Sequence, residues 1–393
     1  MNPHILTPEV QRYLHEHEAV PPSDIAMQRS PFADVSSLEL AQQLDARKRC
    51  RKKLPLWYKT PHIYYPEKIS IEQASSEATA DYKAGLIPPA QRVIDLTGGM
   101  GVDAFFFART AKMVVHCETN QALSRIAQHN AAQLEATQMH FIATDGLTYL
   151  TSQADDAFDY LYVDPSRRLG QRKVFRLEDC EPDVVGVQDE LLQKAEKNLI
   201  KCAPLLDISA AVERLRKVSE VHIVSVDNEC KELLLVRSRT FDGIPRIVVA
   251  ALQGGRTETL TFDITAEKTA VAELGDPERY LYEPDASLLK SGAFKWISQH
   301  YGIRKLGTHT HLYTSSQRIA NFMGKMFCID KVVQYADFKK SKLPVQASVT
   351  ARNFPLKVEA LRHRHRIRDG GDGHLFFCAG MGGRLLVIFT SKC

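Results

Sequence analysis

Acids and glycines gather around one expected turn between a strand and a helix. The apolar stretch at residues 93–96 contains Asp95, and an apolar helix is expected from Ala104 onward. Between them the chain supplies a set of small and acidic residues, namely Thr97, Gly98, Gly99, Gly101 and Asp103. Glycines let the backbone turn tightly and approach a ligand closely at the carboxyl end of a strand. This spacing predicts a site for a nucleoside-containing cofactor.

Two classes of cofactor compete for this turn. Gly99, Gly101 and Ala104 satisfy the G-x-G-x-x-G/A pattern that binds the pyrophosphate of a dinucleotide. An NAD-dependent oxidoreductase is therefore one interpretation. Asp95 favours the other, because a carboxylate at the tip of the strand repels a pyrophosphate but accepts hydrogen bonds from the amino group of a methionine moiety.

Acids after the next two expected strands favour the methionine-containing cofactor as well. Glu118, followed by Thr119, suits two ribose hydroxyls, and Asp145, followed by Gly146, suits an adenine amine. Alone, the first pair is equally compatible with a solvated strand end and the second with a turn. Together they lie at the edge of a parallel sheet where ligands bind, and an acidic edge attracts a cationic sulfonium. We therefore predict S-adenosylmethionine as the cofactor.

A helix is expected just before the first strand, at residues 70–83. Ser75 and Ser76 are candidate caps for it, because a serine hydroxyl accepts a hydrogen bond from a backbone N–H of the first helical turn. The same two serines stand where they can contact the methionine carboxylate. Both interpretations stay open at this point.

The second chemical motif is Asp164-Pro165, which ends the fourth expected strand and is followed by Ser166, Arg167 and Arg168. An exocyclic base amine is a poor nucleophile, because its lone pair is delocalised into the ring. The Asp164 carboxylate and the Pro165 carbonyl can accept hydrogen bonds from both of its N–H groups. Methyl transfer then needs alignment and exclusion of water rather than a metal or a covalent intermediate.

Arg167 is also a candidate catalytic residue, with Arg168 beside it. Guanidinium planes can stack on a base or bind a phosphate, or they can pair with the nearby acids Glu178, Asp179 and Glu181. Methylation of a pyrimidine ring carbon would instead need a cysteine nucleophile. Cys202, the nearest candidate, is interpreted as a core thiol.

These motifs need an α/β sheet to bring them together. Strand-like and helix-like segments alternate from residue 91 to 238, which predicts a doubly wound, Rossmann-like sheet. Strands are expected at residues 92–96, 113–118, 140–143, 160–163, 205–208, 221–226 and 232–236, with the last two antiparallel. A hairpin is expected at 246–252 and 257–262, and another at 375–378 and 385–390. Helices are expected at 7–15, at 36–49 with Ser37 as a cap, and at 356–365.

Composition narrows the class of protein. The chain has 393 residues, 44% of them hydrophobic, which is enough for two or three domains with a sizeable core. Its eight cysteines form no CxxC pair, so we expect reduced thiols, with neither a disulfide framework nor a metal site. His309 and His311 lack a nearby acid or cysteine to complete a ligand set. No apolar run approaches the roughly 18 residues of a membrane span, so we expect a cytoplasmic protein without a membrane partner.

Charge is distributed unevenly. Residues 275–393 hold 19 Lys and Arg against 9 Asp and Glu, a net charge of +10, whereas residues 1–274 carry −6. The densest clusters are 362–368 and 339–342, and Arg352 stands near Phe354 as a possible pair for a splayed nucleotide. A basic cluster at 47–53 is followed by Trp57 and Tyr58, and it is either a solvated helix end or an RNA contact. Such clusters bind a polyanion such as RNA, or are simply solvated faces.

The chain resembles the class I S-adenosylmethionine-dependent methyltransferases, and more narrowly a bacterial group with a ferredoxin-like segment and a THUMP-like domain. The residues that carry the resemblance are Glu72 to Ala80, Asp95 to Asp103, Val163 to Arg168, Tyr282 to Ser287 and Ala351 to Pro355. It implies a helical region at 1–85, the Rossmann-like catalytic domain at 86–274, the ferredoxin-like segment at 275–320 and an α+β THUMP-like domain at 321–393.

The resemblance also implies methylation of RNA, either transfer RNA or ribosomal RNA, with the C-terminal domain presenting the RNA. Amine-methylating enzymes usually continue Asp-Pro with a second proline and an aromatic, whereas this chain has Ser166 and Arg167 there. This departure leaves the target atom open. A non-catalytic RNA-binding protein that keeps the cofactor fold is the remaining alternative.

Overall fold

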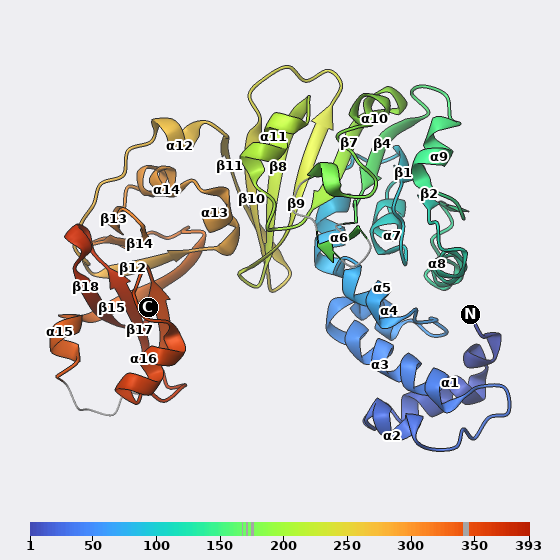
Figure 1. Cartoon of the computed structure of the whole chain (residues 1–393), viewed down its shortest axis with the longest axis horizontal. Helices are drawn as coiled ribbons and strands as arrows, with labels where there is room; N and C mark the ends of the chain where they lie inside the picture. Colours follow the sequence, from blue (N-terminus) through green and yellow to red (C-terminus); the bar gives the residue numbers. More distant parts are fainter. Residues whose placement is uncertain (167, 170–171, 174–176, 341–345) are drawn as a thin grey trace. The chain divides into compact units, whose positions relative to one another are not determined.

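The computed structural model describes residues 1–166, 168–169, 172–173, 177–340 and 346–393. Two compact units make up the chain (Figure 1). The first comprises Met1–Val221 and Leu233–Gly243, and the second comprises His222–Glu232 and Ile244–Cys393. The chain passes between them in strands β8 (Val218–Val226) and β9 (Glu229–Ser238).

The first unit begins with a group of helices: η1 (Pro3–Leu6), α1 (Pro8–Glu16), α2 (Pro22–Ala26), α3 (Ser37–Lys53), α4 (Pro55–Lys59), α5 (Lys68–Gln73) and α6 (Glu77–Ala84). The helices expected at 7–15 and 36–49 are confirmed as α1 and α3. The cap of α3 is Ser36 rather than Ser37, because Ser36 and Glu39 form a reciprocal capping box. The helix expected at 70–83 is interrupted, and Ser76 caps its second part by accepting from the Thr79 amide.

The basic cluster at 47–53 is largely used for internal contacts. Lys48 Nζ donates to the Val20 carbonyl at 2.6 Å, and Lys53 Nζ donates to the carbonyls of Ile71 and Glu72 at 2.8 Å each. Arg49 pairs with Asp45 one turn away. These bonds favour a structural role for the cluster over an RNA contact.

The sheet of the first unit contains β1 (Arg92–Asp95), β2 (Met113–Cys117), β3 (Met139–Ile142), β4 (Phe158–Val163), β7 (Ala195–Cys202) and the part of β9 paired with β7, in the order β9-β7-β4-β1-β2-β3. Strands β3, β2, β1, β4 and β7 are parallel, and β9 is antiparallel to β7. The connecting helices are α7 (Val102–Ala108), α8 (Gln121–Gln133), α9 (Gly146–Thr151), α10 (Gln188–Lys194) and α11 (Ile208–Arg214). A short ladder of β5 (Arg168–Leu169) and β6 (Arg172–Lys173) and the turn η2 (Leu177–Asp179) follow β4.

Six of the seven strands expected in this region are confirmed, but the strand expected at 205–208 is wrong. The fifth strand of the sheet is β7, which begins ten and ends six residues earlier, and its charged residues Glu196, Lys197 and Lys201 hide it from a search for apolar runs. Leu205 is instead exposed in a turn, and Asp207 caps α11 by accepting from the Ala210 amide.

The second unit contains the antiparallel hairpin of β10 (Arg246–Gln253) and β11 (Arg256–Asp263), as expected. A seven-stranded sheet follows, in the order β13-β14-β12-β15-β18-β17-β16. Its strands are β12 (Tyr280–Pro284), β13 (Arg304–Gly307), β14 (Thr310–Ser315), β15 (Gly324–Gln334), β16 (Ser348–Arg352), β17 (His374–Ala379) and β18 (Leu385–Lys392). Its helices are α12 (Ala266–Thr269), α13 (Ala286–Ser291), α14 (Phe294–Tyr301), α15 (Tyr335–Phe338), α16 (Val358–His365) and the turn η3 (Met381–Gly383). The expected hairpin of β17 and β18 and the expected helix α16 are confirmed.

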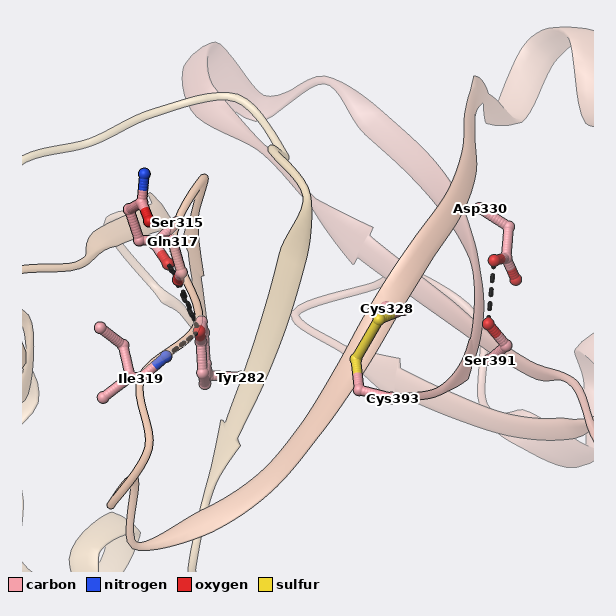
Figure 2. Close-up of a disulfide and its surroundings, with 8 residues drawn as sticks. All are labelled: Tyr282, Ser315, Gln317, Ile319, Cys328, Asp330, Ser391 and Cys393. Carbon is pink, nitrogen blue, oxygen red and sulfur yellow. Dashed lines mark hydrogen bonds between the residues drawn. A yellow bond between two sulfur atoms is a disulfide. The ribbon is translucent and has the colours of Figure 1, made fainter.

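Cys328 and Cys393 form a disulfide, which corrects the expectation that every thiol is reduced. Cys328 lies in β15 opposite Ser391 of β18, so Cys393 follows two residues beyond the paired position. Figure 2 shows that Ser391 also donates a hydrogen bond to the Asp330 carboxylate, at 2.9 Å. The remaining six cysteines are free, and Cys202 is buried as expected. Among the described residues, no helix is long and apolar enough to cross a membrane.

The disulfide closes a loop across a sequence separation of 65 residues, nearly the whole of the region from β15 to β18. Restricting an unfolded chain over such a loop stabilises the folded state by roughly 4 kcal/mol in the chain-entropy model. We predict that dithiothreitol lowers the melting temperature of the wild-type protein. The Cys393→Ser variant should melt at the reduced temperature with or without dithiothreitol. Identical melting of oxidised and reduced wild type would contradict this assignment.

Candidate functional site

The glycine turn follows β1 and is bound to the end of β2. The Gly98 amide donates to the Cys117 carbonyl at 2.8 Å, and the Gly99 amide donates to Glu118 Oε2 at 2.9 Å. Gly99 and Gly101 have φ angles of 55° and 84°, in the left-handed region where a side chain is unfavourable. Gly101 then begins α7. The turn predicted from the sequence is therefore present, and its glycines have a conformational reason.

Glu118 bonds to the turn on one side and to the next loop on the other. Its second oxygen, Oε1, accepts from the Asn120 amide at 2.7 Å and lies 3.3 Å from the Thr119 hydroxyl. A carboxylate oxygen has more than one lone pair, so these bonds leave it able to accept from a ligand hydroxyl. The structure thus places Glu118 and Thr119 at the rim of the turn.

Asp145 is an exposed residue that caps α9, accepting from the amide and the hydroxyl of Thr148 at 2.8 and 2.9 Å. Gly146 packs against the end of β1 so closely that a Cβ there would lie 2.2 Å from the Leu96 carbonyl oxygen. The two residues are therefore next to the glycine turn, as predicted. The capping bonds show that Asp145 also has a structural function.

Asp103 lies in the first turn of α7 and is surrounded by donors. Ser75 Oγ and the Tyr162 hydroxyl donate to its Oδ2 at 2.8 and 2.9 Å, and Lys83 Nζ lies 3.3 Å from its Oδ1. Burial raises the pKa of Asp103, but the charges of Lys83 and Lys201 and these hydrogen bonds outweigh it, so the pKa is lowered overall. Ser75 thus supports an ionised Asp103.

Asp164 is tied both to the turn and to a neighbouring strand. Its amide donates to Thr97 Oγ1 at 2.7 Å, and its Oδ2 accepts from Lys201 Nζ at 2.5 Å. Pro165 is buried directly after it. Arg167 lies outside the described residues, and Glu178 pairs with Arg214 at 3.1 Å. The structure thus brings Asp164 to the same edge as Thr97 and Asp95.

Sequence reasoning missed Lys83, Tyr162 and Lys201. Lys201 was hidden by the misplaced fifth strand, since a strand placed at Ala195–Cys202 would have put Lys201 at its carboxyl end, beside Asp164. Lys83 is fully buried and follows Ser75 by eight residues. No local signal marks Lys83, because α6 also contains the charged residues Glu77 and Asp81, and the sequence does not show which of them is buried.

Asp95 is the most constrained acid of the site. Only 1% of it is exposed, and its Oδ1 accepts from the Thr97 amide at 2.9 Å. Burial raises the pKa of Asp95 well above its usual value, and the nearby carboxylates of Asp103, Asp164 and Glu118 raise it further. A buried acid with acidic neighbours is stabilised by a cation. The site therefore fits the ammonium and sulfonium of S-adenosylmethionine better than a pyrophosphate.

The structure also bears on a cysteine nucleophile and on metal binding. Burial raises the pKa of the Cys202 thiol, the opposite of what a nucleophile requires. Among the described residues, no group of three or more His, Cys, Asp or Glu side chains is arranged to hold a metal ion.

The basic region of the second unit has its own geometry. Arg352 pairs with the buried Glu283 at 2.8 Å, and Phe354 packs edge-on against Tyr335 rather than against Arg352. A hollow of about 700 Å³ lies beside them, lined by Ala351, Asn353, Phe354, Pro355, Leu356, Lys357, Val358 and Glu359. Arg352 is thus held in an ion pair with Glu283, and the pairing of Arg352 and Phe354 around a splayed nucleotide stays a prediction.

A parallel sheet with an antiparallel last strand, a glycine turn after β1 and acids at adjacent strand ends define a class I methyltransferase fold. A crystal structure of a putative methyltransferase from Porphyromonas gingivalis W83 matches at 30% identity over 99% of this chain and 98% of that chain, with a TM-score of 0.90. Family models match a ferredoxin-like domain at residues 280–322 and a THUMP-like domain at residues 324–392. The chain belongs to the family of this methyltransferase-fold protein, with ferredoxin-like and THUMP-like regions at its C-terminal side.

Two further solved structures match part of the chain. A putative methyltransferase from Streptococcus mutans in complex with SAH is 13% identical and covers 41% of this chain and 96% of its own, with a TM-score of 0.31. An rRNA methylase from Streptococcus thermophilus is 15% identical and covers 41% of this chain and 94% of its own, with a TM-score of 0.30. Among curated proteins, no sequence matches this chain.

Replacing Asp95 separates the effect of its charge on the stability of the free protein from its effect on cofactor affinity. Because the pKa of Asp95 is raised in the folded state, its ionised form destabilises the free protein at neutral pH, and this cost fades as the pH falls through the raised pKa. We predict that Asp95→Asn raises the melting temperature of the free protein at pH 8 more than at pH 5. Affinity for S-adenosylmethionine should fall about tenfold or more, as when a charged hydrogen bond is lost. Calorimetry and thermal melts measure the two effects.

Asp159→Asn is a matched control of opposite sign. The hydrogen bond from Arg92 lowers the pKa of Asp159, so its ionised form stabilises the fold above its unfolded pKa, and the variant should melt lower at pH 8. Its cofactor affinity should not change. A lower melting temperature for Asp95→Asn with unchanged affinity would contradict the assignment of Asp95.

Proposed function

We propose that this protein transfers a methyl group from S-adenosylmethionine to RNA, either transfer RNA or ribosomal RNA. The observation that carries the proposal is the buried Asp95 beneath the glycine turn, with Asp103, Glu118 and Asp164 near enough to raise its pKa. Thr97, Gly98, Gly99 and Gly101 form the turn, Ser75 and Ser76 lie upstream of it, and Thr119, Asp145 and Gly146 complete the rim. When bound, the cofactor supplies the electrophilic methyl group.

Asp164 and Pro165 are the residues proposed to receive the acceptor. A carboxylate oxygen and a backbone carbonyl accept hydrogen bonds from the two N–H groups of an exocyclic base amine. These bonds align the amine nitrogen with the methyl group. The hydrogen bond from Lys201 holds the carboxylate, and the bond from its amide to Thr97 connects the acceptor side to the cofactor turn. Arg167 is proposed to stack on the base or bind a phosphate.

RNA is favoured as the acceptor because of the second unit. The match to a THUMP-like domain coincides with the region whose net charge is +10, and a basic surface attracts a polyanion. That surface includes Arg364, Arg366 and Arg368, which are proposed to contact the phosphate backbone of the RNA. We propose that the protein acts on RNA in the cytoplasm.

The acceptor is identified by comparing a strain that lacks this protein with its parent. Mass spectrometry of nucleosides from total RNA should show one methylated nucleoside missing in the deletion strain. Purified protein with isotopically labelled S-adenosylmethionine should restore it. An unchanged nucleoside profile, with label found in protein or a small molecule, would overturn the RNA proposal.

The catalytic assignment is tested with Asp164→Asn. We predict that methyl transfer falls about a hundredfold or more, the usual loss when a preorganised charge is removed from an active site. Affinity for adenosylhomocysteine should stay within a few-fold of wild type, because Asp164 faces the acceptor. Asp189→Asn, an exposed acid paired with Arg216, serves as a control that leaves both unchanged.

Calorimetry, together with assays of methyl transfer and RNA binding, distinguishes the remaining alternatives. Binding of NAD in place of adenosylhomocysteine would establish the oxidoreductase interpretation. An Asp164→Asn variant that methylates at the wild-type rate would remove Asp164 from the mechanism. RNA binding without any transfer by wild type would favour the non-catalytic alternative.

A further inference from the structure

We propose that His116 is a positioning residue, whose imidazole sets the glycine turn at residues 98–101 in the conformation that receives the adenosyl cofactor. The inference rests on the proposed function, since it assigns a further residue to the same cofactor site. It comes from a polar ring that the mechanism above does not use.

His116 lies in β2, the strand between β1 and the edge strand β3, directly beside the cofactor edge. It is paired in register with Asp95 of β1 on one side and with Phe141 of β3 on the other. Its ring centroid is 5.0 Å from that of Phe141. Adjacent residues of neighbouring parallel strands point to the same face of a sheet, so His116 and the buried Asp95 share one face.

The imidazole occupies the space in which a side chain at Gly98 would stand. A Cβ on Gly98 would lie 2.2 Å from His116 Nε2 and 2.4 and 2.5 Å from the two ring carbons beside it. A Cβ on Gly101 would lie 3.7 Å from the same nitrogen. Gly98 does not have a positive φ, unlike Gly99 and Gly101. Its lack of a side chain is therefore required by the His116 ring and not by the backbone conformation.

If His116 served only for packing, a buried imidazole would cost more free energy than an apolar side chain of similar size. His116 is fully buried, and neither ring nitrogen makes a hydrogen bond of good geometry among the described residues. Buried polar atoms without partners cost free energy that an apolar side chain of similar size would not. Burial also lowers the pKa of His116, which keeps the ring neutral beneath a site that receives a cation. A costly residue next to a ligand site is more readily explained by the site than by packing.

The last two residues of β2 and the residue that follows the strand contact the turn. The His116 ring supports Gly98 from below, the Cys117 carbonyl accepts from the Gly98 amide, and the Glu118 carboxylate accepts from the Gly99 amide. A shift of Gly98 away from the ring therefore changes both hydrogen bonds. The position of the ring is thereby transmitted to Glu118, the acid assigned to the ribose.

A size exchange between the two residues tests the inference. Gly98→Ala places a methyl group against the ring, and we expect affinity for adenosylhomocysteine to fall about tenfold or more, because small misplacements of a site are costly. His116→Ala leaves the turn unsupported and should weaken binding about three- to tenfold. In the double variant the new methyl group enters the space left by the ring, so binding should return to within about threefold of wild type.

The measurement is isothermal calorimetry with adenosylhomocysteine on the full chain, well below each variant's melting temperature. A merely structural role would lower melting temperatures without changing the affinity of the folded protein. Gly85→Ala is the matched control, because a Cβ there meets nothing nearer than 3.4 Å. Should Gly98→Ala alone fail to fold, His116→Ala and the double variant still decide.

The possible outcomes separate this inference from the function beneath it. Wild-type protein that does not bind adenosylhomocysteine would overturn the proposed function and this inference together. Wild-type binding with unchanged affinity in Gly98→Ala or His116→Ala would overturn only the inference. Losses that add in the double variant would do the same, since they would show that the two residues act independently.

Discussion

The structure of the candidate site depends on one electrostatic conflict. Four carboxylates, from Asp95, Asp103, Glu118 and Asp164, approach the same sheet edge, and mutual repulsion opposes their ionisation. The chain resolves the conflict unequally: Asp103 has the charges of Lys83 and Lys201 nearby, whereas Asp95 accepts from the amide and, at 3.5 Å, the hydroxyl of Thr97. This imbalance explains why Lys83 is buried beside Asp103 and why Asp95 suits a cationic ligand.

The sequence was sufficient where a residue's type alone determines its place. Glycines with positive φ, and acids that directly follow apolar strands, identified the turn at Gly99 and Gly101 and the rim at Glu118 and Asp145, all of which the structure places at one edge. The motifs of the second unit were equally clear, since the family models match residues 280–322 and 324–392. Local patterns predict such features because the relevant contacts lie within a few residues.

The sequence was insufficient where the decisive contact is distant along the chain. Lys201 meets Asp164 across 37 residues, and Cys328 meets Cys393 across 65. Neither partner signals the other by spacing, because the pairing depends on strand order and register. The misplaced fifth strand shows the same limit, since β7 contains Glu196, Lys197 and Lys201 although it lies between two other strands.

The pairing of β12 with β15 makes the two C-terminal segments depend on each other. The ferredoxin-like match ends at residue 322 and the THUMP-like match begins at 324, yet β12 and β15 are neighbours in one sheet, in register from Tyr280 to Pro284. Separating the two segments would expose a long unpaired edge on each, the kind of edge that aggregates. The two matches therefore cover parts of one sheet, and each segment needs the other to pair its strand edge.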